Sequence, residues 1–264
     1  YFGAHQSIGC KGITLFGTEA QKQRWLTKCA SGELIAAFCL TEAGSGSDAQ
    51  AMRTSAVPSA DGSHYVLNGE KIWISNAGYA GVFTVFAKVP VEIEGKLKQR
   101  VTAFIVDAHA PGITLGAVEQ KMGIKASDTR AVIFEHVKVP VADRLGDVGQ
   151  GFKIALEVLN SGRLGLAAAS ARGAQAIMEV ALAYAKQREQ FGRPIAKFQA
   201  VQQQIAQMAS EIVASDGVVA AAIEAAGMGP GLFSIAAAKS RLGRAVDMTV
   251  DVAHQVHGAI GTTR

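Results

Sequence analysis

The chain has 264 residues, 49% of them hydrophobic, which is enough to bury the core of one large domain or two smaller ones and excludes a disordered chain. Its 26 basic and 22 acidic residues leave a net charge of +4. That charge permits an anionic ligand, but the sequence lacks the basic stripe with interleaved aromatics that is typical of nucleic-acid binding. Three irregularly spaced cysteines, Cys10, Cys29 and Cys39, indicate neither a disulfide framework nor a zinc site and favour a reducing compartment.

Residues 1–33 are predicted to be helical. Thr18-Glu19-Ala20-Gln21 has the spacing of a capping box, and Gly32 is a suitable helix C-terminus. No apolar run approaches the roughly 20 residues that a membrane span needs. Because the sequence begins at Tyr1 without an initiator methionine or a signal-peptide pattern, we expect it to be an interior piece of a longer protein.

A glycine-rich loop is predicted at residues 38–48, where the sequence reads Phe-Cys-Leu-Thr-Glu-Ala-Gly-Ser-Gly-Ser-Asp. Its two glycines lie among hydroxyls, so backbone N–H groups and side-chain oxygens can approach a phosphate or the edge of a heterocycle. Taken alone, the loop is better explained as a solvated turn, because glycine-rich loops are common. It lacks the Lys-Ser or Lys-Thr pair of a Walker loop and the third glycine of a Rossmann fingerprint.

From about residue 34 to residue 146 the hydrophobic period is two, which predicts a compact antiparallel β-domain. Asn68-Gly69 is predicted to be a hairpin turn, followed by a short strand on which Trp73 and Ser75 share a face. The charged residues 92–100 are expected to form a solvated hairpin tip. The clearest predicted strands are residues 65–67, 83–86, 102–106 and 131–134.

After about residue 147 the composition is rich in alanine, leucine, methionine and glutamine, which predicts three long helical segments. Breaks are expected at residues 192–194 and 227–231, where glycine and proline cluster. The many alanines favour close helix packing, as in a bundle that continues across a subunit interface. One apolar stripe at helical spacing is formed by Val201, Ile205, Met208 and Ile212.

Seven motifs in register along the chain resemble the acyl-CoA dehydrogenase family. One such motif is weak evidence, but seven in the same order and spacing are specific. The first half, notably residues 4–9, 38–42 and 122–127, is most similar to the very-long-chain branch of that family. The motifs are residues 38–47, 73–75, 121–127, 149–152, 160–163, 188–192 and 255–258.

The resemblance implies an α+β fold of the acyl-CoA dehydrogenase type. Residues 1–33 would be the remnant of an N-terminal helical domain, residues 34–146 a middle β-domain with the flavin and acyl-CoA site, and residues 147–264 an incomplete C-terminal helical bundle.

The resemblance also implies a flavoprotein oxidoreductase of fatty-acid β-oxidation. With FAD as cofactor, it would convert a long-chain acyl-CoA to a trans-2-enoyl-CoA, as a base removes the α-proton and the β-hydrogen leaves as hydride. Hydrogen bonds to the thioester carbonyl would stabilise the developing enolate. Electrons would pass to an electron-transferring flavoprotein, and the enzyme would be a homodimer or homotetramer in a bacterial cytoplasm or a mitochondrial matrix.

Site residues are carried over from the family where the motifs match. The segment 255–258 would reach the FAD of a neighbouring subunit. The implied FAD-binding residues are Phe38, Leu40, Thr41, Gly46, Ser47, Trp73, Ile74, Ser75, Arg188, Phe191, Gln199, Gln255, Val256, His257 and Gly258. The implied substrate-binding residues are Ser47, Phe152, Asn160 and Arg163.

Several candidates also have a purely structural explanation. Without the resemblance, Trp73 is better explained as a core aromatic and Arg188 as a solvated helix end. Arg163 lies among leucine and alanine, where an unpaired guanidinium would be costly, so we expect a phosphate or carboxylate partner. His254 and His257 have no third ligand nearby in the sequence, so no metal site is predicted.

No catalytic base is assigned within the chain. The usual glutamate of the family would lie beyond Arg264, and the segment that precedes it departs from the family pattern at Gly258-Ala259 and Thr262. The identity and position of the base therefore stay open, as does the acyl-chain length. The carboxylates of Glu42, Asp48 and Glu70 are expected to have cap or surface roles.

Two alternatives to the dehydrogenase are left open by the sequence. One is an acyl-CoA oxidase, in which oxygen reoxidises the flavin. The other is a non-catalytic FAD-binding member of the same family that serves as an assembly or scaffold partner.

Overall fold

A computed structural model describes residues 3–229 and 231–263, and Pro230, in the second predicted break, lies outside them. The chain forms two compact units, residues 1–159 and 160–264, each of which is described by itself. In the part of the chain that the structure describes, no helix is long and apolar enough to cross a membrane.

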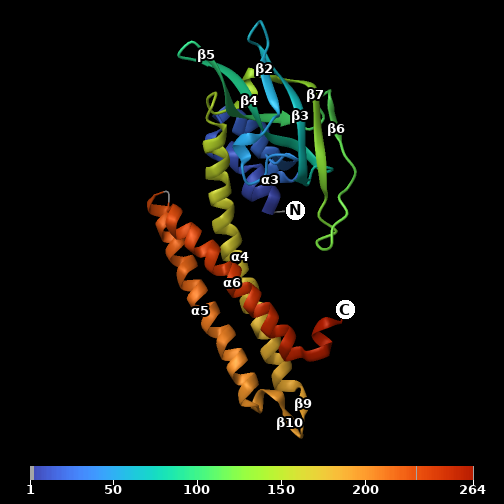
Figure 1. Cartoon of the computed structure of the whole chain (residues 1–264), viewed down its shortest axis with the longest axis vertical. Helices are drawn as coiled ribbons and strands as arrows, with labels where there is room; N and C mark the ends of the chain where they lie inside the picture. Colours follow the sequence, from blue (N-terminus) through green and yellow to red (C-terminus); the bar gives the residue numbers. More distant parts are fainter. Residues whose placement is uncertain (1–2, 230, 264) are drawn as a thin grey trace. The chain divides into compact units, whose positions relative to one another are not determined.

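The first unit begins with short helices, drawn in blue in Figure 1. The predicted capping box is confirmed, since Thr18 Oγ1 accepts from Gln21 N and Gln21 Oε1 accepts from Thr18 N. Gly32 ends the last of these helices in the left-handed conformation, with φ of 81°. The helical turns are η1 (Gly3–Gly9), α1 (Lys11–Phe16), α2 (Glu19–Gln21), η2 (Lys22–Leu26) and α3 (Thr27–Ser31).

The rest of the first unit is built on an eight-stranded sheet, in which seven strands follow the order β6-β7-β3-β2-β4-β5-β8 and β1, the eighth, pairs with β4. Figure 1 labels the strands from β2 to β7. The four predicted strands are confirmed, and residues 92–100 lie at the tip of the β4–β5 hairpin as expected. The strands are β1 (Ile35–Cys39), β2 (Ser55–Pro58), β3 (His64–Ser75), β4 (Ala80–Ile93), β5 (Lys96–Asp107), β6 (Ile113–Leu115), β7 (Thr129–Pro140) and β8 (Arg144–Leu145).

The prediction of a purely antiparallel sheet is wrong in one respect. Both β1 and β2 pair with β4 in the parallel direction, while the other pairs are antiparallel. A parallel pair needs a long crossover, and the segment between β1 and β4, which includes β2 and β3, supplies it. Hydrophobic periodicity identifies the strands, but it does not determine which strands pair or in which direction.

Both faces of the sheet are buried around β4. Phe83 and Val85 belong to one apolar cluster, and Val82 and Phe86 belong to a second cluster that includes Ile13 and other residues of the N-terminal helices. Successive side chains of a strand point to opposite faces, so the nearly continuous apolar run in β4 fills both clusters.

The prediction of a turn at Asn68-Gly69 is wrong, because β3 continues through both residues. The register between β3 and β7 shifts between Leu67 and Gly69, and Asn68 Oδ1 accepts a hydrogen bond from His136 N at 2.8 Å. Gly69 has φ of 146°, and a Cβ atom there would lie 2.6 Å from Thr54 Oγ1. Glycine is therefore needed for a close approach inside the sheet rather than for a chain reversal.

The second unit contains α4 (Gly151–Gln187) from Asn160 onward, α5 (Gln199–Met228) and α6 (Leu232–His257), which confirms the three predicted helices. A small hairpin of β9 (Glu189–Gln190) and β10 (Arg193–Pro194) precedes α5, and η6 (Gly258–Thr262) follows α6. The predicted stripe on α5 is confirmed, since Met208 and Ile212 are buried and Val201 and Ile205 pack against the same core. Alanines such as Ala181, Ala185 and Ala253 fill much of this core.

Candidate functional site

The glycine-rich loop and the Trp-Ile-Ser strand lie side by side in the first unit. Ile72 N of β3 donates a hydrogen bond of 2.9 Å to the carbonyl oxygen of Thr41. At the first residue of the predicted loop, which the structure places in β1, the ring of Phe38 packs on Phe86, with their centroids 4.9 Å apart. Two motifs that are distant in the sequence are thus joined through the backbone.

Trp73 is exposed over 62% of its surface, so its interpretation as a core aromatic is wrong. A second register shift between β3 and β7, between Lys71 and Ile74, accompanies this exposure, and Trp73 has φ of 56°. The shift breaks the alternation between Lys71 and Ile74, which are both buried although they are three residues apart. From Trp73 to Ser75 the burial alternates again, as expected for two residues that share a face. Ile74, by contrast, is only 2% exposed and belongs to the sheet core.

The loop rests on a buried ion pair between Lys71 and Glu42. Lys71 is completely buried, and its Nζ donates to Glu42 Oε1 at 2.7 Å and to the Leu40 carbonyl at 3.1 Å. Glu42 also accepts hydrogen bonds from Arg53 N, Thr54 N and Thr54 Oγ1. The predicted cap or surface role of Glu42 is therefore wrong, whereas Asp48 and Glu70 are exposed as expected.

The importance of Lys71 was missed in the sequence. Its position in the strand could have indicated burial. Lys71 is an even number of residues from Tyr65 and Leu67, which are buried, so its side chain is expected on the same face of the strand. A lysine at a buried position requires a partner that offsets the loss of its hydration. Glu42 is that partner, and together the two side chains fix the entry to the glycine-rich loop.

Burial disfavours the ionised form of Glu42, but the hydrogen bonds from Lys71, Thr54 and Arg53 outweigh it and lower the pKa of Glu42. Burial also lowers the pKa of Lys71, although the ion pair with Glu42 opposes this. These hydrogen bonds tie the Glu42 carboxylate of the loop to Lys71, Thr54 and Arg53.

We expect the free energy of unfolding to decrease with acidification because of Glu42. Its lowered pKa means that the unfolded chain binds a proton first, so its stabilising contribution is complete above about pH 4.3 and is lost as the pH falls through the native pKa. Urea titrations between pH 6 and pH 3 measure this slope. The slope should become smaller in Glu42→Gln and stay unchanged in Glu70→Gln, which removes an exposed carboxylate; equal slopes in all three proteins would contradict the assignment.

A second group of candidates lies around the β9–β10 hairpin. Phe191 is 93% exposed with φ of 54°, and its ring contacts Phe198 edge-on, with the centroids 6.2 Å apart. Gln199, the next residue, begins α5 and is exposed. The exposed Arg188 joins the same segment, because its carbonyl accepts a hydrogen bond from Ile195 N.

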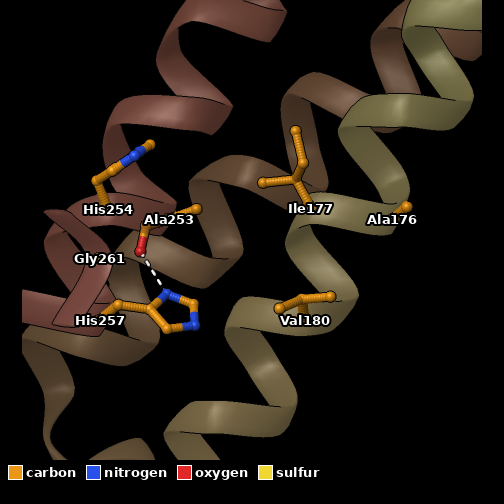
Figure 2. A pocket seen from close by; sticks show the side chains of 7 residues that line it. All are labelled: Ala176, Ile177, Val180, Ala253, His254, His257 and Gly261. Atoms are coloured by element: carbon orange, nitrogen blue, oxygen red, sulfur yellow. Dashed lines mark hydrogen bonds between the residues drawn. The ribbon is translucent and has the colours of Figure 1, made fainter. Parts of the chain in front are cut away.

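The end of α6 borders a pocket of about 400 Å³ in the second unit (Figure 2). Its walls are Ala176, Ile177 and Val180 of α4, together with Ala253, His254, His257 and Gly261. The ring of His257 stacks on Tyr184, and its Nδ1 lies 2.7 Å from the Ala253 carbonyl. Gln255 and Gly258 are exposed beside this pocket, whereas Val256 is part of the core.

The substrate candidates are placed in both units. Asn160 and Arg163 are joined by a hydrogen bond of 2.6 Å from Arg163 Nη1 to Asn160 Oδ1, and Arg163 is exposed. In the first unit Ser47 is exposed, and Phe152 packs against the apolar cluster of the N-terminal helices. The guanidinium of Arg163 is therefore in reach of a ligand from solvent.

Comparison with known proteins identifies the family. Residues 1–33, 37–137 and 149–264 match the N-terminal, middle and C-terminal domains of acyl-CoA dehydrogenases in turn. The structure of butyryl-CoA dehydrogenase from Megasphaera elsdenii superposes with a TM-score of 0.91 at 38% identity, covering 99% of this chain and 67% of that one. The chain belongs to the acyl-CoA dehydrogenase family. The α+β fold implied by the motifs is thereby confirmed.

Two further relatives define what this acyl-CoA dehydrogenase family member resembles. The mitochondrial very long-chain specific acyl-CoA dehydrogenase of Homo sapiens is 55% identical over 208 residues, which are 78% of this chain and 32% of that protein. The chain thus matches about a third of the length of that relative. An acyl-CoA dehydrogenase from Bacillus anthracis, solved in complex with FAD, has a TM-score of 0.85 and 38% identity over 99% of this chain and 47% of that one.

Proposed function

We propose that the chain carries an FAD site and an acyl-CoA site of an acyl-CoA dehydrogenase that converts long-chain acyl-CoA to trans-2-enoyl-CoA. The observation that carries this proposal is the junction between the glycine-rich loop and the strand with the exposed Trp73, made by the bond from Ile72 N to the Thr41 carbonyl. An exposed aromatic plane beside hydroxyls and backbone polar groups suits a flat heterocycle. Membership of the family, and the FAD held by the Bacillus anthracis relative, support the choice of cofactor.

In the first unit, the pyrimidine edge of the flavin would meet Phe38, Leu40 and Thr41. The side chain of Leu40 is buried, so it would contribute backbone groups, while Thr41 would add its hydroxyl. Trp73 would pack on the isoalloxazine and exclude water, with the Ser75 hydroxyl near N5. When bound, FAD supplies the hydride acceptor, which no protein side chain can replace. The remaining contacts in this unit would come from Gly46, Ser47 and Ile74.

In the second unit, Arg188, Phe191 and Gln199 would contact the diphosphate or adenosine part of FAD. All three are exposed, as binding to a ligand outside the unit requires. The segment Gln255, Val256, His257 and Gly258 would reach the FAD of a neighbouring subunit. This arrangement implies a homodimer or homotetramer, in which each FAD is held by two copies of the chain.

Acyl-CoA would be bound by Asn160, Arg163, Ser47 and Phe152. Arg163 is oriented by Asn160 and carries a charge that matches the phosphates of CoA. The preference for long acyl chains is supported by the identity to the human very long-chain enzyme. We assign no catalytic base among the residues of this chain.

Electrons would leave the reduced flavin for an electron-transferring flavoprotein, in a bacterial cytoplasm or a mitochondrial matrix. An acyl-CoA oxidase would instead use oxygen, and a scaffold member would bind FAD without turnover. Aerobic and anaerobic reoxidation of the reduced protein, with and without an electron-transferring flavoprotein, separates the first two possibilities. The scaffold alternative is tested by adding acyl-CoA, because a scaffold member would keep its flavin oxidised.

The decisive experiment is the visible spectrum of the purified protein, recorded anaerobically while palmitoyl-CoA is added. We expect a flavin band at about 450 nm that disappears during the titration, since reduced flavin loses this band. A bound flavin that stays oxidised with long and short acyl-CoAs would contradict dehydrogenase activity of this chain. A folded protein that takes up no FAD would contradict the assigned cofactor site.

Replacing Trp73 by alanine should weaken FAD binding and slow flavin reduction. Loss of one aromatic contact removes about 0.5–1.5 kcal/mol, or roughly a twofold to tenfold change in the dissociation constant. Flavin content after dialysis and the reduction rate in stopped flow measure the effect. Phe233→Ala, which removes another highly exposed aromatic, is the matched control, and identical flavin content and rates in the two variants would remove Trp73 from the site.

A further inference from the structure

A cluster of His5, Cys10 and Cys29 lies among the N-terminal helices, apart from the residues assigned to FAD and acyl-CoA. The two sulfur atoms and a ring nitrogen of His5 all lie within 4.8 Å of one another. Cys10 is the residue between η1 and α1, and Cys29 lies in α3, so the fold brings two distant thiols together. Both cysteines are buried and reduced.

A pocket of about 260 Å³ borders this cluster. That volume is large enough for several water molecules, and hence for a small oxidant of similar size such as hydrogen peroxide. The pocket is lined by His5, Gln6, Cys10, Thr14, Leu26, Cys29 and Ala30.

Both ring nitrogens of His5 already have partners. Its Nδ1 accepts a hydrogen bond of 2.9 Å from Ala36 N in β1, which leaves the proton on Nε2, 3.2 Å from the Cys29 carbonyl. A metal ion would have to displace the Ala36 amide to gain a nitrogen ligand, and so leave a buried N–H group without a partner. The arrangement therefore favours chemistry of the two thiols over metal binding.

The two thiols differ in acidity. A hydrogen bond from the Cys10 thiol lowers the pKa of Cys29, although burial opposes this, and the same interaction together with burial raises the pKa of Cys10. The Cys10 sulfur also lies 3.7 Å from His5 Nδ1, the ring nitrogen that carries no proton, so Cys10 has an acceptor for its S–H group. We therefore expect Cys29 to be the sulfur that attacks. A redox-sensing cysteine needs a resolving cysteine beside it and access for the oxidant. The neighbouring thiol meets the first need, and the pocket that both cysteines line meets the second.

We propose that Cys10 and Cys29 form a reversible disulfide when the protein meets hydrogen peroxide. The Cys29 thiolate attacks one peroxide oxygen, so that an S–O bond forms, the O–O bond breaks, and the released hydroxide takes up a proton to become water. The Cys29 sulfenic acid is then attacked by the sulfur of Cys10. The S–S bond forms as the S–O bond breaks, and hydroxide leaves with the Cys10 proton as a second water.

In this reaction two thiols lose two electrons, and one peroxide is reduced to two water molecules. Side-chain rotation has to bring the sulfur atoms from within 4.8 Å to the disulfide length of about 2.05 Å. An external dithiol reverses the reaction by thiol–disulfide exchange.

Cys39 is an internal control. It lies in β1, is completely buried, and is surrounded by the sheet core, where desolvation raises its pKa. We expect Cys39 to stay reduced under conditions that oxidise the pair.

The test uses the full chain, reduced and then freed of reductant, and treated with one equivalent of hydrogen peroxide. Counting thiols after denaturation should give a decrease from three to one, and mass spectrometry of a digest should find Cys10 and Cys29 linked with the loss of two hydrogens. Treatment with dithiothreitol should restore three thiols. A thiol count that stays at three, a loss confined to Cys39, or a disulfide only between two chains would overturn the proposal.

Variants distinguish the two roles. In Cys10→Ser, dimedone should trap a sulfenic acid on Cys29, whereas Cys29→Ser should leave Cys10 unreacted and Cys39→Ser should behave as the parent chain. Zinc alone provides a further arm: if one equivalent binds tightly and protects both thiols from peroxide, the cluster is a metal site and the proposal is wrong. If zinc does not bind tightly, the result supports the proposal that the two cysteines form a disulfide.

Discussion

Replacing Lys71 by methionine is expected to lower the free energy of unfolding by about 3–5 kcal/mol, because it leaves the Glu42 carboxylate buried without its cationic partner. Methionine fills a similar volume, so the change removes the charge more than the packing. The loss of the bond to the Leu40 carbonyl adds a second unpaired buried group at the entry to the glycine-rich loop. The variant should therefore hold FAD less tightly as well as unfold more easily.

Lys22→Met is the matched control for Lys71→Met. Lys22 pairs with Glu19 at 2.9 Å, close to the 2.7 Å of the buried pair, but both of its groups reach solvent. Exposed pairs of this kind contribute about 0–1 kcal/mol, so the control should lose little stability. Urea denaturation of the two variants measures the difference, and equal losses would mean that Lys71 does not stabilise the fold through a buried charge.

Periodicity and local signals predicted most elements of this fold. The capping box at Thr18, the helix end at Gly32, the four strands and the three long helices depend on nearby residues, and each is confirmed. The errors concern interactions that only the folded chain creates. Asn68-Gly69 is a frequent turn signal, but here the packing of Thr54 against Gly69 decides its role.

The sequence indicated which short motifs belong to the candidate site, but not the contacts between segments that are distant in the sequence. The loop at residues 38–48 and Trp73 were assigned to the site only through the family motifs, since their own residues favour a solvated turn and a core aromatic. The bond between Ile72 N and the Thr41 carbonyl, which joins the two segments, could not be predicted from either one. The Lys71–Glu42 pair depends on the depth at which a strand lies, which a sequence does not state. The pair Cys10 and Cys29 has no spacing rule at all, because separate helices bring the two thiols together.

Gly69→Ala tests the interpretation of this residue as a point of close approach. The backbone at φ of 146° is strained for alanine, and the new methyl group would lie within 3 Å of three atoms of Thr54. We expect about 1–3 kcal/mol from the backbone strain and about 1–3 kcal/mol from overpacking. Thr54 donates two hydrogen bonds to Glu42, so its displacement should also disturb the Lys71–Glu42 pair.

Gly62→Ala separates the two contributions. Gly62 also has a positive φ, of 69°, but a Cβ atom there would meet nothing within 4 Å. This variant should show only the strain, about 1–3 kcal/mol, and should keep FAD as the parent chain does. Denaturation curves and flavin retention of the two variants measure the difference. If Gly69→Ala loses no more stability or flavin than Gly62→Ala, Thr54 can move away from the new methyl group. In that case the close approach of β3 to Thr54 does not require a glycine at position 69.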